Sequence, residues 1–338
     1  MAQGAPELPV TPANGASVMA VEETISTGGE QTQRQVWDRG GEPDGNRATW
    51  HDYLALGKPL IVLLLLATTW AGMVVGGGRL PSPSLAFWTL LGGGLAAAGA
   101  SALNQYIDRD LDARMLRTRR RPLPAGRVPP NRAAIFGAGL CVLGVSILAI
   151  AVNPLSALLA ALGAIYYVGA YSLLLKKTTP QNIVIGGGAG AIPPLVGWAA
   201  ATGSLAMPAF FLFAIVFFWT PPHFWALALT RQGDYARAGV PMFPVVYGDP
   251  ATRWAIFLYS VQLVALTLLL PGIGMVSSVY LVAALALGLV FVLRAWGLLR
   301  GGGTRRAWAL YRYSSIYLAL IFGAMVLDIL LRAPISAG

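Results

Sequence analysis

Three oxygen-bearing side chains stand four residues apart in one stretch of the chain: Asn104, Asp108 and Asp112. On a helix this spacing places them along one stripe. Two carboxylates four residues apart repel each other in an ordinary helix, and a bound divalent cation reverses that effect. Mg²⁺ prefers oxygen ligands and is usually held by one or two carboxylates together with substrate phosphates. The stripe therefore favours a magnesium–diphosphate site; an acidic helix end that offsets nearby arginines is the alternative interpretation.

The segment around and after the stripe is strongly basic. Residues 108–132 contain eight arginines, and arginine is suited to bidentate contacts with phosphate. The run Pro-Leu-Pro-Ala-Gly at residues 122–126 predicts a stiff loop, and Lys176 and Lys177 supply further cations. The arginines could instead serve only to orient the chain in a membrane. Their number and the neighbouring aspartates favour a phosphate site.

The composition is that of a membrane protein. Charged residues make up 11% of the chain, hydrophobic residues make up 56%, and the mean hydropathy is +0.63; a soluble domain carries about a quarter charged residues. The net charge is +10, but most bases lie between apolar runs, which is typical of topology signals and lipid contacts. We therefore expect no nucleic-acid partner. One cysteine and two histidines exclude a Cys/His zinc framework.

Nine segments approach the roughly 20 apolar residues that a membrane-spanning helix needs. They are residues 60–78, 85–107, 133–152, 155–175, 183–201, 208–229, 252–270, 277–299 and 311–331. The predicted fold class is all-α, a polytopic membrane helix bundle formed by residues 51–338. Residues 1–50 are rich in Gly, Glu, Gln, Thr and Pro, so we expect a disordered cytoplasmic tail.

The connections between the nine segments differ in charge on the two sides. With nine spans, 22 of the 24 Lys and Arg residues fall on the N-terminal side, and only Arg79 and Arg332 fall opposite. The positive-inside rule then predicts a cytoplasmic N-terminus and an external C-terminus. The tail resembles neither a secretory signal nor a mitochondrial transit peptide. The expected location is therefore a bacterial plasma (inner) membrane.

Further acids lie on both sides of the predicted bundle. Asp234 and Asp249 follow the sixth span, on the same side as the stripe, so we expect one polar site over a hydrophobic bundle. Asp328 falls inside the ninth span, four residues before Arg332, a spacing that favours an interfacial ion pair. A proton relay is the alternative for Asp328, because intramembrane acids are often functional.

Several stretches resemble the UbiA-type intramembrane prenyltransferases. The stripe, followed by Arg-Thr-Arg-Arg-Arg-Pro-Leu-Pro-Ala-Gly-Arg at residues 117–127, looks like the first aspartate motif of that superfamily. Three other stretches are similar to its protohaem IX farnesyltransferase (haem O synthase) branch. They are Thr-Pro-Gln-Asn ending at Asn182, Trp-Thr-Pro-Pro-His ending at His223, and Asp-Tyr-Ala-Arg-Ala-Gly-Val-Pro-Met beginning at Asp234. The resemblance covers about residues 52–335.

The resemblance implies nine helices around a central cavity open to the cytoplasmic side, with Mg²⁺ as cofactor. It implies farnesyl diphosphate as donor and haem b as acceptor, one vinyl group of which takes the farnesyl chain through an allylic carbocation to give haem O. The lipid bilayer is a further partner, and a downstream haem A synthase or a terminal oxidase assembly is a candidate partner. Pro193-Pro194 and Pro221-Pro222 are expected to interrupt helices beside the cavity.

The same resemblance suggests roles for individual residues. Asn104, Asp108 and Asp112 would be catalytic ligands of the first Mg²⁺, and Asp234 would complete that site or hold a second ion. The superfamily commonly has another aspartate four residues later, where this chain has Ala238. The substrate-binding candidates for the diphosphate are Arg117, Arg121, Lys176 and Lys177. Asn182 either caps the fifth span or contacts the diphosphate. His223 either packs through a hydrogen bond or contacts the haem iron or a propionate.

Two other functions stay open. A UbiA-type enzyme for hydroxybenzoate, a quinone precursor or a chlorophyll precursor would share the stripe, but the Trp-Thr-Pro-Pro-His run and the single Asp234 disfavour it. A secondary transporter also has broken helices and buried acids. That function predicts carboxylates near mid-membrane and an internal repeat, whereas these acids lie at one edge and the stripe does not recur.

Overall fold

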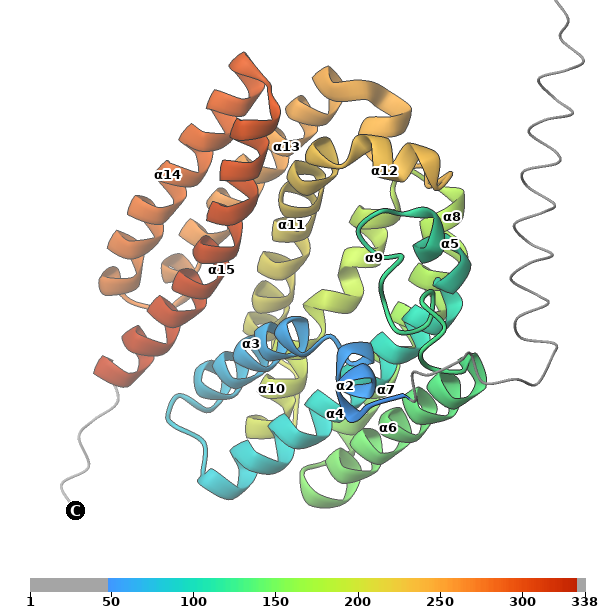
Figure 1. Ribbon diagram of the computed structural model, residues 1–338. Coiled ribbons are helices and arrows are strands. Elements are labelled where there is room, and N and C mark those ends of the chain that lie inside the picture. Colours follow the sequence, from blue (N-terminus) through green and yellow to red (C-terminus); the bar gives the residue numbers. More distant parts are fainter. Residues whose placement is uncertain (1–47, 333–338) are drawn as a thin grey trace, which may run out of the picture. The chain divides into compact units, whose positions relative to one another are not determined.

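The computed structural model describes residues 48–332, and every regular element in this range is helical (Figure 1). Within that range nine helices or continuous helical runs are long and apolar enough to cross a membrane. In chain order they are α3 (Pro59–Gly77), α4 (Pro83–Ile107), α6 (Pro130–Ala151), α7 to α8 (Pro154–Thr178), α9 to α10 (Asn182–Thr202), α11 (Met207–Thr230), α13 to η2 (Phe243–Ile273), α14 (Ser278–Gly301) and α15 (Thr304–Arg332). The predicted all-α, polytopic fold class is confirmed, and the protein is a multi-pass membrane protein.

Shorter elements complete the described part of the chain. They are α2 (Trp50–Leu56), α5 (Arg109–Arg114), η1 (Tyr166–Leu175), α8 (Lys176–Thr178) and α12 (Gln232–Arg237). Because consecutive spans alternate in direction, α2, α5, α8 and α12 belong to one side of the bundle, which we call the Arg-rich side. The predicted disordered tail, residues 1–50, lies outside the described residues except for its last three positions.

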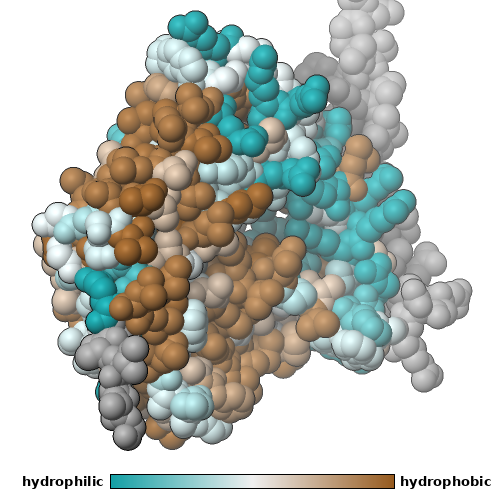
Figure 2. Space-filling model, turned by 90° about the vertical axis from the view of Figure 1, so that its left-hand side faces the viewer, coloured by the Kyte–Doolittle hydropathy of each residue, from teal (hydrophilic) through white to brown (hydrophobic). Residues whose placement is uncertain are grey.

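The helices begin and end where local chemistry requires. Proline occupies the first position of α3, α4 and α6, where its missing N–H is not needed. Asn153 accepts a hydrogen bond from the Ser156 amide, 2.8 Å away, and so caps α7. Large aliphatic side chains face outward: Leu60 is 81% exposed and Ile150 is 87% exposed. Figure 2 shows a broad apolar face of this kind, with hydrophilic residues gathered at its margins.

Small residues bring the helices into close contact. A methyl group on Gly99 of α4 would lie 2.5 Å from the carbonyl oxygen of Gly137 in α6, so only glycine allows this approach. At Gly197 in α10 the added atom would lie 1.9 Å from the carbonyl oxygen of Thr69 in α3. Close packing through small residues is the usual way for helices to associate in lipid. The first contact fixes α4, the helix that carries Asn104, against α6, and the second joins α10 to α3.

The seventh and ninth helical segments begin before the predicted spans. A short helical segment starts at Phe243, but the backbone at Gly248 is non-helical, with φ 75°, so the long helix that follows begins close to the predicted residue 252. The ninth begins at Thr304 instead of residue 311. Its extension, which includes Arg305 and Arg306, lowers the hydropathy without ending the helix.

One of the two expected proline breaks is present. Helix α9 ends at Ala191 and α10 begins at Pro193, as the Pro193-Pro194 pair predicts. The expectation for Pro221-Pro222 is wrong, because α11 continues through both residues to Thr230. On this helix the Thr220 hydroxyl donates a hydrogen bond to the Val216 carbonyl at 2.8 Å.

Candidate active site

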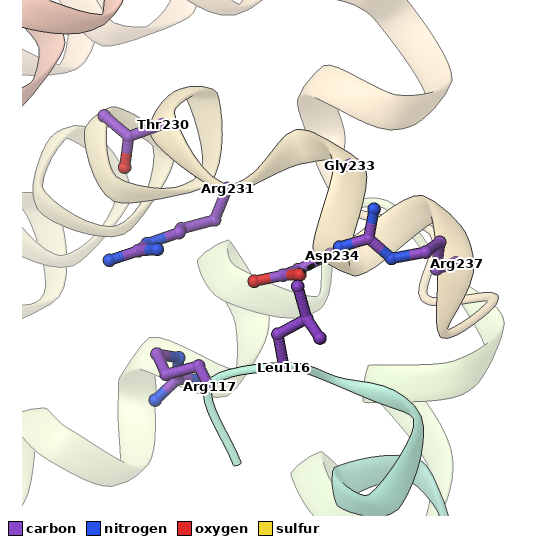
Figure 3. A pocket seen from close by; sticks show the side chains of 7 residues that line it. All are labelled: Leu116, Arg117, Thr230, Arg231, Gly233, Asp234 and Arg237. Atoms are coloured by element: carbon purple, nitrogen blue, oxygen red, sulfur yellow. Dashed lines mark hydrogen bonds and ion pairs between the residues drawn. The ribbon is translucent and has the colours of Figure 1, made fainter. Parts of the chain in front are cut away.

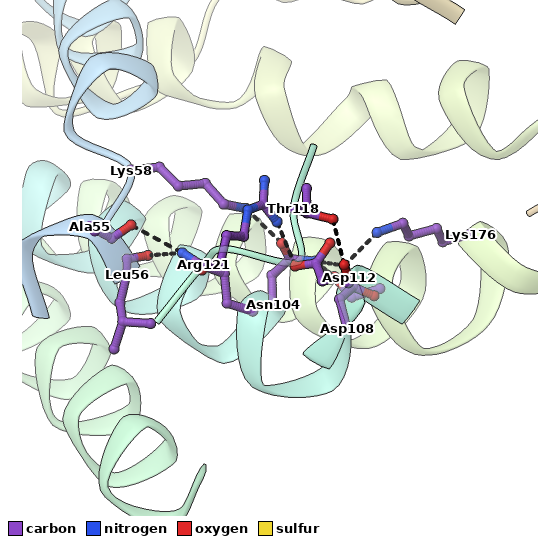
Figure 4. A network of polar contacts seen from close by, with 11 residues as sticks. Ala55, Leu56, Lys58, Asn104, Asp108, Asp112, Thr118, Arg121 and Lys176 are labelled. Carbon is purple, nitrogen blue, oxygen red and sulfur yellow. Dashed lines mark hydrogen bonds and ion pairs between the residues drawn. The ribbon is translucent and has the colours of Figure 1, made fainter. Parts of the chain in front are cut away.

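The predicted stripe forms where α4 passes into α5. Asn104 lies in the last turn of α4, Asp108 is the junction residue and Asp112 lies in α5. The three residues are 3%, 1% and 2% exposed, respectively. The Asn104 amide donates to Asp108 Oδ2 at 2.7 Å, so the four-residue spacing does bring these two side chains together (Figure 4).

A cation lies against each member of the stripe. Lys176 Nζ is 2.5 Å from Asp108 Oδ2, and Arg121 Nη1 is 2.6 Å from Asp112 Oδ2. Lys58 Nζ is 2.7 Å from Asn104 Oδ1. Burial, together with the nearby charges of Arg121 and Lys176, lowers the pKa of Lys58 to about 7. The stripe therefore lies in a dense cluster of basic side chains, which favours the binding of an anion.

Three buried oxygens in this region lack a hydrogen-bond partner among the described residues. They are Gln105 Oε1, Asp108 Oδ1 and Asn182 Oδ1. A buried acceptor without a donor costs about 1–3 kcal/mol, so such an atom needs an explanation. Carboxylate and amide oxygens are the ligands that Mg²⁺ accepts. The unpartnered Asp108 oxygen, beside Asn104 and Asp112, fits a divalent cation.

A π-helix sets the orientation of the Asn104 amide. Asn104 Nδ2 also donates to Ser172 Oγ at 2.9 Å, and that hydroxyl donates to the Tyr167 carbonyl at 2.8 Å, five residues earlier in η1. Both amide hydrogens are then used, by Asp108 and by Ser172. The amide oxygen is left to face the cation, which is the orientation that a metal ligand requires. Short π-helical segments frequently occur at functional sites.

The arginine-rich loop is anchored on both sides of Arg121. The Thr118 hydroxyl donates to the Asp112 carbonyl at 2.9 Å. Beyond the Pro-Leu-Pro-Ala-Gly run, Arg127 pairs with Asp52 of α2 at 2.7 Å. The hydrogen bond from Arg127 lowers the pKa of Asp52 below its usual value, against an opposing effect of burial. These contacts support the predicted stiff loop.

Asp234 lies in a cavity of its own, of about 560 Å³, on the same Arg-rich side (Figure 3). The lining residues are Leu116, Arg117, Thr230, Arg231, Gly233, Asp234 and Arg237. Asp234 pairs with Arg237. Residues 48–332 contain no group of three or more Asp, Glu, His or Cys side chains close enough to hold one metal ion. Asp234 therefore does not join Asp108 and Asp112 around a single ion in this structure.

The loop after the stripe links the two regions. Leu116 and Arg117 line the Asp234 cavity, whereas Arg121, four residues on, reaches Asp112. Burial raises the pKa of Tyr235, next to Asp234, and the Arg117 cation acts in the opposite direction. The predicted diphosphate contacts are thus divided: Arg121 and Lys176 lie at the stripe and Arg117 at the cavity. Lys177 is exposed.

Asn182 does not cap its helix. It is the first residue of α9, Gln181 is the N-cap, and no side-chain cap bond forms, so the capping interpretation is wrong. Its Nδ2 atom lies 3.5 Å from the Lys176 carbonyl oxygen. Asn182 is completely buried, and its contact is with the backbone of Lys176, the lysine whose side chain reaches Asp108.

His223 packs in an aromatic cluster far along the chain from the stripe. Its ring stacks on Trp219 with centroids 4.2 Å apart, and Nδ1 lies 2.7 Å from Ser314 Oγ. The Ser314 hydroxyl itself donates to the Tyr311 carbonyl at 2.7 Å. Because a hydroxyl has one hydrogen, His223 donates through Nδ1, and Nε2 carries the free lone pair.

Asp328 forms the predicted ion pair with Arg332, at 3.0 Å. It also accepts hydrogen bonds from the backbone amides of Ser277, at 2.9 Å, and Tyr280, at 3.2 Å, and from the Ser277 hydroxyl. Every one of these contacts lies at the start of α14. Asp328 is therefore a capping residue that joins α15 to α14.

The profile of the UbiA prenyltransferase family matches residues 65–321. The chain belongs to the UbiA prenyltransferase family. It is 54% identical to a protoheme IX farnesyltransferase of Chloroflexus aurantiacus over 82% of this chain and 47% of that protein. It is 51% identical to the protoheme IX farnesyltransferase of Symbiobacterium thermophilum over 82% of this chain and 94% of that protein.

The chain spans about half the length of several of these UbiA-family relatives, 47% of the Chloroflexus protein and 53% of a Roseiflexus one. Among solved structures, a digeranylgeranylglyceryl phosphate synthase aligns with a TM-score of 0.71 at 19% identity, covering 83% of this chain and 98% of that one. A UbiA homologue from Archaeoglobus fulgidus, bound to GPP and Mg²⁺, aligns with a TM-score of 0.65 at 18% identity, covering 81% and 99%. At these identities the likeness establishes the UbiA fold alone.

Two site residues of this UbiA-family chain were missed by sequence reasoning: Lys58 and Ser172. Lys58 is separated from Asn104 by 46 residues and Ser172 by 68, so no local spacing relates them to the stripe. One signal for Lys58 was available. It is the only charged residue at the start of the first span, directly before Pro59.

Proposed function

We propose that this chain transfers a farnesyl group from farnesyl diphosphate to a vinyl group of haem b, which gives haem O. The observation that carries the proposal is the buried stripe of Asn104, Asp108 and Asp112 with a cation against each member. Such an arrangement suits a metal-held diphosphate. The names of relatives that are 51% and 54% identical support farnesyl as donor and haem as acceptor.

The diphosphate half of the reaction is assigned to the stripe. Asn104, Asp108 and Asp112 would hold one Mg²⁺, and Asp234 would hold a second. When bound, Mg²⁺ stabilises the negative charge that develops on the departing diphosphate. Arg121, Lys176 and, from the Asp234 cavity, Arg117 donate hydrogen bonds to the phosphate oxygens. Lys177 belongs to the same basic turn at greater distance.

The bond changes balance without a protein nucleophile. The C1–O bond of farnesyl diphosphate breaks, and its electron pair leaves with the diphosphate. The π electrons of the haem vinyl group form the new C–C bond to the allylic cation. Water then adds to the resulting cation next to the ring and loses a proton, which completes the hydroxyethylfarnesyl group. The task of the chain is to stabilise charge and to exclude water until the C–C bond forms.

His223 is assigned to the haem half of the reaction. Its free Nε2 lone pair can ligate haem iron or accept a hydrogen bond from a protonated propionate. The rings of Trp219 and Tyr311, with centroids 4.2 Å and 4.6 Å from that of His223, offer apolar faces to a porphyrin. Asn182 is assigned an indirect role, in which it holds the turn that carries Lys176.

The cellular setting is part of the same proposal. We place the chain in a bacterial plasma membrane with the Arg-rich side and the N-terminus in the cytoplasm, because 22 of 24 Lys and Arg residues fall on that side. Residues 51–338 form the catalytic membrane domain, with residues 1–50 as a cytoplasmic tail. Haem O would pass to a haem A synthase or to a terminal oxidase assembly.

The deciding experiment is incubation of the purified chain with haem b, farnesyl diphosphate and Mg²⁺, followed by mass analysis of the haem products. We expect haem b plus farnesyl plus water. The parallel incubation offers hydroxybenzoate or a quinone precursor. Transfer to that acceptor, with haem b unchanged, would reject haem and keep the family. No prenyl transfer to any acceptor would reject the enzyme assignment itself.

A further inference from the structure

Lys58 has an unusual backbone conformation. With φ 51° and ψ 62° it is left-handed, and among the described residues it is the only one other than glycine with positive φ. A left-handed conformation is unfavourable for a residue that carries a Cβ atom. Pro59, which follows, also restricts it. Strain of this kind persists only where the surrounding structure enforces it, and it concentrates at functional sites.

Helix α2 supplies that enforcement. Gln105 Nε2 donates to the carbonyls of Ala55, at 3.1 Å, and Leu56, at 2.9 Å, and so ties the end of α2 to α4. Asp52 ties the start of α2 to Arg127 of the arginine-rich loop. Leu56 is completely buried. Gln105 is the neighbour of Asn104, so the contact that fixes α2 also places Lys58 over the stripe (Figure 4).

The cation that Lys58 places there competes with a metal ion. Its Nζ lies 2.7 Å from Asn104 Oδ1, the oxygen that the hydrogen bonds to Asp108 and Ser172 leave free for a metal. A metal ion and an ammonium group cannot share that oxygen, because their charges repel. Metal binding alone would therefore displace the Lys58 ammonium group from Asn104 and leave it without a new partner. Loss of its partner is unfavourable for a half-buried charge.

The cost disappears when a diphosphate arrives with the metal. The displaced ammonium group then finds phosphate oxygens, and a charge-assisted hydrogen bond replaces the one that it lost. The backbone of Lys58 stays in place, and only its flexible side chain moves. Lys176 and Arg121 likewise contact members of the stripe, Asp108 and Asp112, and could exchange these contacts for phosphate oxygens.

We propose that Lys58 is a diphosphate-binding residue that occupies the metal-ligand oxygen of Asn104 until metal and diphosphate enter together. The site then binds a divalent cation weakly by itself and strongly with diphosphate, because the same lysine opposes the first event and supports the second. This inference rests on the diphosphate half of the proposed function and is independent of haem.

The test measures Mn²⁺ binding to the purified full-length chain by electron paramagnetic resonance, with and without inorganic pyrophosphate. For the wild type we expect pyrophosphate to raise Mn²⁺ affinity by a factor in the range of roughly 5–150 that is common for coupled sites. For Lys58→Met we expect Mn²⁺ alone to bind more tightly and the enhancement by pyrophosphate to fall at least about fivefold. Lys58→Arg should keep most of the enhancement.

In Lys58→Met the affinity for Mn²⁺ alone should rise while the enhancement by pyrophosphate falls. These opposite changes separate the proposed role from a purely structural one. If Lys58→Met merely disturbed the fold, Mn²⁺ affinity would fall both with and without pyrophosphate, and thermal unfolding would detect the damage; that result overturns the proposal. Unchanged affinities in Lys58→Met overturn it as well. Arg132→Met, at an exposed arginine on the same side, is the matched control and should behave as the wild type. If pyrophosphate and Mn²⁺ do not bind the wild type together, the diphosphate site itself is wrong.

Discussion

Asp108 and Asp328 are both buried carboxylates that contact a cation, yet their surroundings differ. Their side chains are 1% and 0% exposed. Asp328 receives two backbone amides and a hydroxyl besides Arg332, and neither of its oxygens is left without a partner. Asp108 receives Asn104 and Lys176 on Oδ2 alone, and within the described residues Oδ1 has no partner.

The difference separates a carboxylate whose two oxygens are both hydrogen-bonded from one that keeps an unpartnered oxygen. Burial of a charge is tolerated when hydrogen bonds satisfy it, and at Asp328 all of them come from the chain and join α15 to the start of α14. At Asp108 the described residues satisfy one oxygen and leave the other without a partner. Burial and an adjacent cation are common to both residues, so neither property identifies a site. What distinguishes Asp108 from Asp328 is its unpartnered oxygen.

Asp108→Asn should have the largest effect on catalysis. The substitution keeps the shape and removes the charge, so transfer of the prenyl group should fall on the order of 10²-fold or more, while thermal unfolding changes little. The assay is mass analysis of the prenylated product. Asp110→Asn is the matched control, because that neighbouring carboxylate is 70% exposed. Full activity in Asp108→Asn would remove the distinction between the two carboxylates.

Asp328→Ala should have the largest effect on stability. Its removal leaves the backbone amides of Ser277 and Tyr280 at the start of α14 without their acceptor, which costs about 1–3 kcal/mol. Arg332, 39% exposed, keeps its hydrogen bond to the Met275 carbonyl. We expect a lower midpoint of thermal unfolding and unchanged turnover per folded molecule. A loss of turnover without a loss of stability would instead favour a proton relay at this residue.

Ser172→Ala should have an intermediate effect that is confined to the metal. Without the Ser172 hydroxyl the Asn104 amide is free to rotate, and loss of such an orienting contact lowers metal affinity about 10–100-fold. Product formation should recover at high Mg²⁺. Ser156→Ala, at a buried serine earlier in the same span, is the control. Equal metal dependence in both variants would show that η1 does not orient the ligand.

Removal of the Asp52–Arg127 ion pair should have the smallest effect on stability. Its side chains are 11% and 31% exposed, so Asp52→Asn should cost about 1 kcal/mol or less. The pKa of Asp52 is lowered in the folded chain, so its contribution is present above the unfolded value of about 3.9 and is lost as pH falls through the lower folded value. Thermal unfolding from pH 7 to 3 should show the wild type and Asp52→Asn converging at the acid end.

Prediction from the sequence succeeded wherever the signal was local. Apolar runs located nine spans within a few residues at most ends, and the four-residue spacing placed Asn104 beside Asp108. The sequence-based prediction was wrong where proline or charged residues, which usually end an apolar helix, lie within a helix that continues. Pro221-Pro222 did not end α11, and hydropathy placed the start of the ninth span at residue 311 instead of Thr304.

The sequence alone determined the helices, the acid stripe and the basic segment beside it, because these depend on composition and on spacings of a few residues. The tertiary structure decided which oxygens are satisfied. Contacts over 46 and 68 residues bring Lys58 and Ser172 to Asn104, and a contact over 51 residues brings Ser277 to Asp328. Such distances are closed only by helices that pack closely through small residues such as Gly99, so one buried aspartate became a cap and the other kept an oxygen without a partner among the described residues.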